Sequence, residues 1–427
     1  MRRDFIKLCG LAGLGVAAPI GMSTTGRAQT RELEPYEGPY YIVFNASGGW
    51  DTTYLMDPKG VNELNRLYKE DDILTKGAHK FAPTAAHIEA GMSNEDFYAE
   101  YGEQLLVMNG IDYSVNNHSP CSRYMATGKL DSLAYPTFAA LVAACKGSDC
   151  PLAFLTFGNY SSTGNLVPMA RVPYLPTLKL IANADFVNGA PQHPYFDDFV
   201  SEQIEQALKD QTDARVEQAR LPRIERAQSM LYSAQVNSKA LKRVVPFIAD
   251  QPPKERLHQQ AEIALASFAA GVCVSANLSI GQFDSHANND RDQMKLIPEF
   301  LAGIDYTIKR AEELGIRDKL VVVIQSEMGR TPNYNKGDGK DHWSIGSIMF
   351  LGNGITGNRV IGETDEGQFL TPINSQSLKL DPEKGVRVRP EHIHDALRRH
   401  AGIADHEFSK KFPLKVEKAE QLLGLWG

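Results

Sequence analysis

Short apolar runs alternate along this chain with longer amphipathic segments. The apolar runs have the length and composition of buried strands, and they lie at 40–44, 105–108, 153–157, 272–280, 320–325 and 347–351. Segments with a helical spacing of apolar residues lie at 135–146, 253–270, 291–314 and 390–401. Strands that alternate with helices predict an α/β domain, built on a doubly wound, mostly parallel sheet with helices on both faces.

One region departs from this alternation. Residues 201–250 are charged and rich in alanine and glutamine, with helical spacing at 201–213 and 224–245. No heptad persists for three repeats, so a coiled coil is not indicated. We therefore expect a single domain at 40–427 with a helical insertion near 201–250, preceded by an exposed arm at 29–39.

The first 28 residues have the pattern of an export signal. Arg2 and Arg3 precede an uncharged stretch rich in glycine and alanine at 8–23, and a paired arginine in this position is a twin-arginine address. Small residues in the sequence Gly-Arg-Ala place the expected cleavage near Ala28. The other interpretation, an amphipathic first helix, is disfavoured by the glycine content and by Pro19. The protein is thus predicted to reach the periplasm or the exterior through the twin-arginine export machinery.

Composition and charge exclude several classes of partner. The chain has 427 residues, of which 42% are hydrophobic and 23% charged, as in ordinary globular domains. Its formal net charge is -7, and removal of the basic signal would make the mature chain more acidic. An acidic balance argues against binding to nucleic acid or to anionic lipid. No later segment is apolar over the length that a membrane span needs, so no stable span is expected after cleavage.

The cysteines do not indicate a metal finger or a redox motif. Four remain after the expected cleavage, and no two have the CxxC spacing. Cys145 and Cys150 flank a four-residue loop that an oxidising compartment could close as a disulfide. Two unpaired thiols near a helix end are the alternative, and the sequence leaves both open.

Candidate metal ligands follow two of the predicted strands. Asp51 lies in a glycine-rich loop after the first strand, where a carboxylate suits a divalent cation or, alternatively, caps the next helix. Asp284 and His286 follow the strand at 272–280. Their oxygen and nitrogen can reach one metal, although Asp284 could instead orient His286 or cap a helix.

A third segment begins at Glu327, again at a strand end, and continues to Asp341 and His342 before the next strand. Glu327 is a candidate ligand or general base, and Arg330 a candidate clamp for an oxyanion. An ion pair between Glu327 and Arg330 is the structural alternative. Acidic and imidazole side chains on separate loops of one sheet edge together favour a functional site.

A fourth segment, at 116–128, contains His118, Ser119, Cys121 and Arg123 at a predicted helix start. A nucleophile or a bound anion gains there from the positive potential of the helix N-terminus. Cys121 with His118 is a weaker candidate for a thiol nucleophile and its base, because their spacing does not establish the geometry. By contrast, two histidines at 392 and 394 point in different directions on a predicted helix and are expected to be structural or solvated.

The motifs together resemble one family. In chain order they are Gly-Gly-Trp-Asp, Asn-His-Ser-Pro with Met-Ala-Thr-Gly, Phe-Asp-Ser-His, Ser-Glu-Met-Gly-Arg-Thr-Pro and Asp-His-Trp. They resemble the exported bacterial family called domain of unknown function 1501 (DUF1501), related to the alkaline phosphatase and sulfatase superfamily. The resemblance spans roughly 40–403 and implies an alkaline-phosphatase-like α/β domain with metal ligands at one sheet edge.

The resemblance also implies roles for individual residues. Asp51 matches one metal ligand, while Asp284, His286 and His342 look like the ligands of another metal. Glu327 stands where the superfamily places an Asp-His pair, but Met328 follows it, so one nitrogen ligand is missing. The nucleophile position offers His118 and Ser119 among others without a clean match, and the segment lacks the Cys-x-Pro-x-Arg pattern of sulfatases. His118 is alternatively a further metal ligand.

These observations predict an exported metal-dependent hydrolase of small phosphate or sulfate esters. A divalent metal such as zinc, calcium or manganese would polarise the ester and activate Ser119 or a water, and Arg123 or Arg330 would stabilise developing charge. The alternative is a non-catalytic exported protein that keeps the scaffold with a degenerate metal site and acts in binding or assembly. A thiol hydrolase based on Cys121 would need no metal.

Overall fold

The computed structural model describes most of the chain beyond the predicted export signal. The described residues are 34–61, 63–84, 91–148, 150–172, 174–183, 186–187, 193–218 and 241–427. The predicted signal at 1–28, and the part of the predicted arm before residue 34, lie outside them. None of the helices in these ranges is both long enough and apolar enough to cross a membrane.

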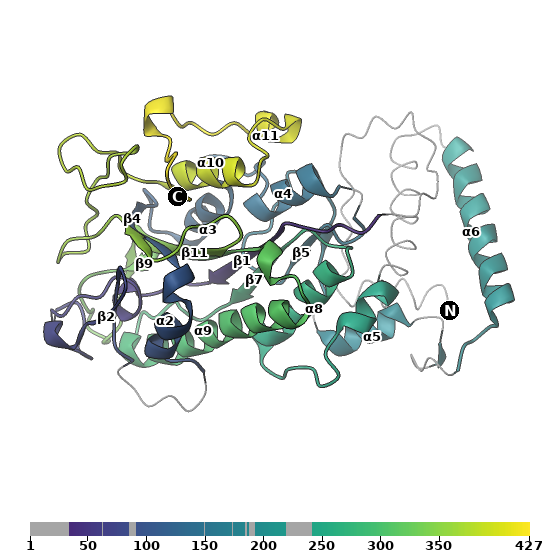
Figure 1. Ribbon diagram of the computed structural model, residues 1–427, viewed down its shortest axis with the longest axis horizontal. Helices are drawn as coiled ribbons and strands as arrows, with labels where there is room; N and C mark the ends of the chain where they lie inside the picture. Colours follow the sequence, from purple (N-terminus) through teal and green to yellow (C-terminus); the bar gives the residue numbers. More distant parts are fainter. Residues whose placement is uncertain are drawn as a thin grey trace.

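An eight-stranded sheet forms the centre of the fold (Figure 1). Its strands lie in the order β12-β4-β11-β8-β1-β7-β5-β6. Their bounds are Tyr40–Ala46 (β1), Leu106–Asp112 (β4), Phe154–Thr156 (β5), Met169–Ala170 (β6), Ser275–Ile280 (β7), Leu320–Ser326 (β8), Ile345–Gly352 (β11) and Arg359–Ile361 (β12). All neighbouring pairs are parallel except the two that β11 makes with β4 and β8.

Helices cover both faces of the sheet because successive strand residues point to opposite sides. In β1, Ile42 and Phe44 enter one apolar core, and Tyr41 and Val43 enter the other. The first core is covered by α2 (Asn94–Tyr101), α8 (Arg256–Ala269) and α9 (Asn289–Glu313), and the second by α3 (His118–Thr127), α4 (Phe138–Lys146) and α10 (Pro390–His400). The two groups lie on opposite sides of the strands in Figure 1. The predicted α/β fold class is confirmed.

Smaller elements complete the fold. A hairpin joins β2 (Leu74–Lys76) to β3 (His79–Phe81), and β9 (Gly329–Arg330) pairs with β10 (His342–Trp343). Helix α5 (Leu175–Ala182) adds buried residues to the first core, and α11 (Glu407–Lys411) contacts α4. Helix α6 (Asp198–Gln218) stands apart from the sheet in Figure 1. The first half of the predicted insertion is thus helical, and 219–240 lie outside the described residues.

The loop with two cysteines is not closed by a disulfide. Cys145, in α4, is a free cysteine in the structure. Burial raises the pKa of its thiol to about 11, so it is protonated at neutral pH. Of the two alternatives that the spacing allows, the structure has the one without a bond between Cys145 and Cys150.

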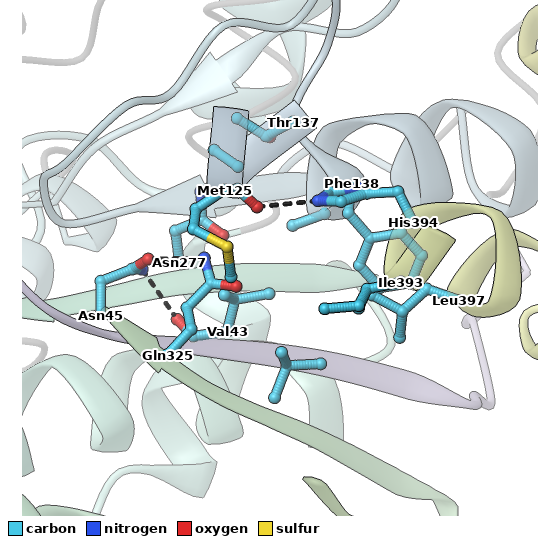
Figure 2. Close-up of a pocket in the computed structure, with 13 residues that line it drawn as sticks. Val43, Asn45, Met125, Thr137, Phe138, Asn277, Gln325, Ile393, His394 and Leu397 are labelled. Atoms are coloured by element: carbon cyan, nitrogen blue, oxygen red, sulfur yellow. Dashed lines mark hydrogen bonds between the residues drawn. The ribbon is translucent and has the colours of Figure 1, made fainter. Parts of the chain in front are cut away.

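The two predicted structural histidines are confirmed as such. On α10, Nδ1 of His392 accepts a hydrogen bond from the main-chain nitrogen of Arg389, and Nε2 of His394 lies 2.7 Å from the main-chain oxygen of Met125. Figure 2 shows His394 beside an internal cavity of about 10 Å³ between α10 and the sheet. Both side chains are buried, and burial lowers the pKa of His394 to about 4.

Buried His394 predicts a pH-dependent loss of stability. Between its folded pKa of about 4 and its ordinary value near 6.5, the unfolded chain binds a proton that the native chain does not. The free energy of unfolding therefore falls as pH is lowered through this window, by about 3 kcal/mol from this group, and levels off below it. Denaturant unfolding at pH 7 and pH 4.5 should show a smaller fall for His394→Gln than for the native chain. The exposed His193→Gln should leave the fall unchanged, and equal falls in all three chains would contradict the prediction.

Candidate metal centre

Four side chains from separate segments meet at one edge of the sheet. His118 begins α3, just after β4, while Asp284 and His286 lie in the loop after β7. His342 begins β10, directly before β11. Because β11 runs opposite to its neighbours, its amino end lies at the edge where the parallel strands end. Each residue offers one ligand atom, and these atoms lie within 4.8 Å of one another.

Each imidazole in this cluster is held by a contact on its Nδ1 atom. The partners are Oε1 of Glu327 for His118 (2.9 Å), Oδ1 of Asp341 for His286 (3.0 Å) and the main-chain oxygen of Asn116 for His342 (2.9 Å). An acceptor beside Nδ1 selects the tautomer that is protonated there, which leaves a lone pair on Nε2. All three rings therefore turn a metal-binding nitrogen toward the centre.

The spacing of the central atoms fits one shared ion. Nε2 of His286 lies 3.0 Å from Nε2 of His342 and 3.0 Å from Oδ1 of Asp284. Nε2 of His118 lies 3.2 Å from Oδ2 of Asp284. Four ligands at about 2.0–2.1 Å from a tetrahedral zinc stand about 3.3 Å apart. In the tautomers that are protonated on Nδ1, the Nε2 lone pairs of His286 and His342 face each other at 3.0 Å, an arrangement that a cation between them would stabilise.

Arg330 holds the carboxylate of the cluster. Its buried guanidinium donates to Oδ1 of Asp284 at 2.8 Å and also to the main-chain oxygens of Gly48, Gly49 and Lys340. Burial acts to raise the pKa of Asp284, but the hydrogen bond and charge of Arg330 outweigh it and hold that pKa below the ordinary value. Asp284 is therefore ionised at neutral pH. Arg330 is committed to this scaffold and is not free to clamp a substrate anion.

The glycine-rich loop after β1 allows this close packing. Gly48 has a φ of 122° and Gly49 a φ of 100°, in the region that favours glycine. A Cβ on Gly48 would lie 2.5 Å from the main-chain nitrogen of Asp284. A side chain at Gly48 would therefore displace the loop that carries Asp284 and His286.

Glu327 contacts the Nδ1 atom of His118, the ring nitrogen that does not face the other ligands. Its side chain is 6% exposed, and Oε1 pairs with Nδ1 of His118. Its other oxygen, Oε2, is buried and has no hydrogen-bond partner among the described residues. The predicted alternative, an ion pair between Glu327 and Arg330, is not formed, since Arg330 pairs with Asp284. Glu327 thus sets the orientation of His118 and adds negative charge beside the centre.

Replacing Glu327 by glutamine should weaken metal binding by about 10–100-fold, the usual effect of losing a carboxylate behind a ligating histidine. The amide keeps an acceptor for His118 but removes the negative charge. Competition with a zinc-binding dye measures the affinity, and Glu366→Gln, at an exposed position, is the matched control. Equal affinities in Glu327→Gln and the native chain would contradict this role.

Asp51 lies outside the cluster. Its side chain caps the short 3-10 turn Thr52–Tyr54 by accepting from the main-chain nitrogen of Thr53, as the capping alternative anticipated. Its carboxylate also lies 2.7 Å from Nζ of Lys340, and both side chains are fully buried. The structure therefore gives Asp51 an ammonium partner from the chain itself, and does not bring it to the metal centre.

Of two other predicted site residues, Ser119 is exposed to solvent and Arg123 is hydrogen-bonded to the main chain. Ser119 follows His118 at the start of α3 and is exposed. Arg123 donates from Nε and Nη2 to the main-chain oxygen of Leu130, at 2.8 and 2.6 Å. These bonds attach the guanidinium of Arg123 to the loop after α3, and its role as an oxyanion clamp stays a prediction.

Cys121 does not have the properties of a nucleophile. It is fully buried, and its Sγ donates to the main-chain oxygen of Val115. Burial raises the pKa of the thiol to about 12, so thiolate is scarce at neutral pH. The structure therefore argues against the thiol-hydrolase hypothesis.

Sequence reasoning did not assign the partners that orient the ligands. Asp341 adjoins His342 in the sequence, and that pair was the only available signal for it. Asn116 acts through its main-chain oxygen, which its residue type does not reveal. Lys340 stands in a polar loop of the sequence but is completely buried in the structure.

Comparisons with known proteins agree with the family resemblance. Residues 186–393 match the model of a family described as a protein of unknown function, DUF1501. This range contains Asp284, His286, Glu327, Arg330 and His342. No curated protein sequence matches the chain.

Several solved structures are similar in fold. Ps i-CgsB is 8% identical with a TM-score of 0.41, covering 86% of this chain and 72% of that one. The lipoteichoic acid synthase LtaP from Listeria monocytogenes is 8% identical with a TM-score of 0.39, covering 94% and 78%. The PsFucS1 sulfatase from Pseudoalteromonas sp. is 9% identical with a TM-score of 0.38, covering 91% and 72%. Likenesses this distant say nothing about the reaction of this chain. The family match confirms the resemblance carried by the motifs: residues 186–393 of this chain are similar to the DUF1501 family.

Proposed function

We propose that this protein is an exported, metal-dependent hydrolase of phosphate or sulfate esters. The observation that carries the proposal is the convergence of three imidazole nitrogens and one carboxylate at metal-ligand spacing, each imidazole oriented through Nδ1. Three nitrogen donors favour zinc or another transition ion over calcium, which prefers oxygen ligands. A divalent metal held there would supply Lewis-acid polarisation of an ester oxygen and a water of lowered pKa.

The residues around the cluster have distinct tasks in this proposal. His118, His286 and His342 hold the ion, while Glu327 and Asp341 keep two of these rings in the required tautomer. Those two carboxylates also balance the charge of a dication, since the charge of Asp284 is already matched by Arg330. The ligand side chains are between 20% and 47% exposed, so a substrate can reach the centre from solvent.

An anionic ester suits the entrance to this centre. The N-terminus of α3 lies at the cluster through His118, and helix N-termini favour negative charge because their first main-chain N–H groups lack helical acceptors. Ser119 is exposed in that first turn, and in this proposal it attacks the ester or donates a hydrogen bond to it. Arg330 pairs with Asp284 and Arg123 donates to the main-chain oxygen of Leu130, so in this proposal the N-terminus of α3 supplies positive potential to the substrate.

A second candidate is a non-catalytic exported protein that binds metal and serves in binding or assembly. The commitment of both Arg123 and Arg330 to main-chain oxygens favours it, because an ester hydrolase usually presents a free cation to its substrate. Metal content would be the same for both candidates. Only turnover separates them.

The test is hydrolysis of aryl phosphate and aryl sulfate esters by the full chain, purified after expression with its own signal and loaded with Zn²⁺ or Mn²⁺. We expect turnover that disappears on chelation and in His286→Ala. Ser119→Ala would lower turnover by orders of magnitude if Ser119 attacks, and by about tenfold or less if water does. A metal-loaded chain that hydrolyses neither class would favour the binding protein. Fractionation of cells that carry Arg2→Lys/Arg3→Lys tests the export route, since this variant should stay in the cytoplasm.

A further inference from the structure

The carboxylate of Asp51 has no free acceptor site. Oδ1 accepts from the main-chain nitrogen and the hydroxyl of Thr53, at 3.1 and 2.7 Å. Oδ2 accepts from Nδ2 of Asn289 at 3.0 Å and pairs with Nζ of Lys340 at 2.7 Å. An ionised carboxylate offers about four lone-pair positions. These four donors fill them, so a metal could reach Asp51 only by displacing one.

The ammonium of Lys340 is enclosed on several sides. Besides Asp51, it donates to the main-chain oxygen of Leu64. The rings of Tyr54 and Tyr334 lie with their centroids 5.6 and 5.1 Å from Nζ, within the range of cation–π attraction. The lysine side chain is fully buried. The ammonium of Lys340 therefore occupies a buried site whose carboxylate, carbonyl oxygen and aromatic rings all favour a cation.

The main chain of Lys340 ties this position to the metal centre. Its nitrogen donates to the main-chain oxygen of Ser285 at 3.0 Å, next to His286 in the sequence. Its oxygen accepts from Nη1 of Arg330 at 3.1 Å, and Arg330 in turn holds Asp284. Lys340 also precedes His342 by two residues. The ammonium is therefore fixed beside the cluster by the same loops that carry the ligands.

We infer that the centre takes a single divalent metal, and that Lys340 supplies the buried positive charge beside Asp51 that a second metal would otherwise supply. This inference rests on the proposed function, because it states how many metal ions the proposed metal centre binds. A second dication at Asp51 would have to remove the ammonium from a position that it fills, and would be repelled by it if both remained. Asp51 and Lys340 are thus positioning residues, not metal ligands.

Metal stoichiometry tests the inference. The full chain is saturated with Zn²⁺, freed of loose metal by gel filtration, and its zinc measured by mass spectrometry. We expect one equivalent in the native chain, one in Asp51→Asn, and none in His286→Ala. Two equivalents in the native chain, falling to one in Asp51→Asn, would overturn the inference and leave the hydrolase proposal intact. No zinc in the folded native chain would overturn both.

A pair of variants tests the cation position directly. Lys340→Met frees a lone pair on the buried Asp51 carboxylate, so this chain should take up a second zinc equivalent. Lys340→Met/Asp51→Asn removes both charges and should return to one. A second equivalent absent from a folded Lys340→Met chain, as judged by circular dichroism, would overturn the assignment of a cation position. If Lys340→Met does not fold, the native and Asp51→Asn stoichiometries still decide the number of metals.

Discussion

A chain with Asp284→Ala and His286→Ala should lose metal binding while it still folds. The two substitutions remove two of the four converging ligand atoms and leave only the imidazoles of His118 and His342. If Zn²⁺ is supplied at about 1,000 times its dissociation constant, the native chain gains about 4 kcal/mol in free energy of unfolding. The variant should gain nothing. Thermal unfolding with Zn²⁺ and with a chelator, beside zinc content, measures both effects.

The measured quantity must be the increment caused by zinc, because the variant also changes the metal-free protein. Loss of Asp284 leaves the buried guanidinium of Arg330 without its carboxylate, and an unpaired buried charge lowers stability by itself. His286→Ala alone keeps that pair and should still lose most of the zinc increment. Asp131→Ala/His193→Ala changes the same residue types at exposed positions and should keep the full increment.

Retention of stoichiometric zinc by Asp284→Ala/His286→Ala would place the metal elsewhere and remove the basis of the hydrolase proposal. A native chain that is folded, metal-free and indifferent to chelator would do the same. In either case Ser119 would lose its proposed catalytic role, and a search for binding partners would be the next experiment.

The sheet could be predicted because its strands are buried on both faces. Buried parallel strands appear as continuous apolar runs, and the observed β1, β4, β7, β8 and β11 each overlap a predicted run. β5 has only three residues but lies within the apolar run predicted at 153–157, whereas β6 and β12 were not predicted. The amphipathic helices α8 and α9 were found within a few residues of their bounds, since their apolar spacing is regular.

The edge of the sheet that carries the centre was predictable for a topological reason. Residues after parallel strands collect at one edge, so Asp284, His286 and Glu327 were expected together. His342 precedes a strand, and it joins them because that strand, β11, runs antiparallel to its neighbours. Residue types do not reveal whether a carboxylate binds a metal ion or pairs with a cationic side chain. Asp51 has the same sequence context whether it binds a metal or accepts from Lys340, because that lysine comes from a loop remote in sequence. The same holds for the two arginines: residue type does not reveal that Arg123 donates to the main-chain oxygen of Leu130 or that Arg330 pairs with Asp284.

Lys340→Met should be strongly destabilising in the metal-free protein. The substitution keeps an unbranched side chain of similar length, but it leaves the Asp51 carboxylate fully buried without its ammonium. Breaking one side of a buried ion pair costs about 3–5 kcal/mol in free energy of unfolding. Denaturant unfolding in the presence of a chelator measures this loss. Lys336→Met, at an exposed position of the same loop, should change stability by about 0.5 kcal/mol or less.

The double variant Lys340→Met/Asp51→Asn separates the charge from the shape of this pair. Asparagine keeps an oxygen that can accept from Thr53, and no buried charge is left unpaired. We therefore expect the double variant to be more stable than Lys340→Met alone, even though it carries one more substitution. If the losses in free energy of unfolding caused by Lys340→Met and Asp51→Asn simply add in the double variant, the two side chains do not act as a pair. Recovery would show that the ammonium stabilises the loop before His342 by balancing Asp51.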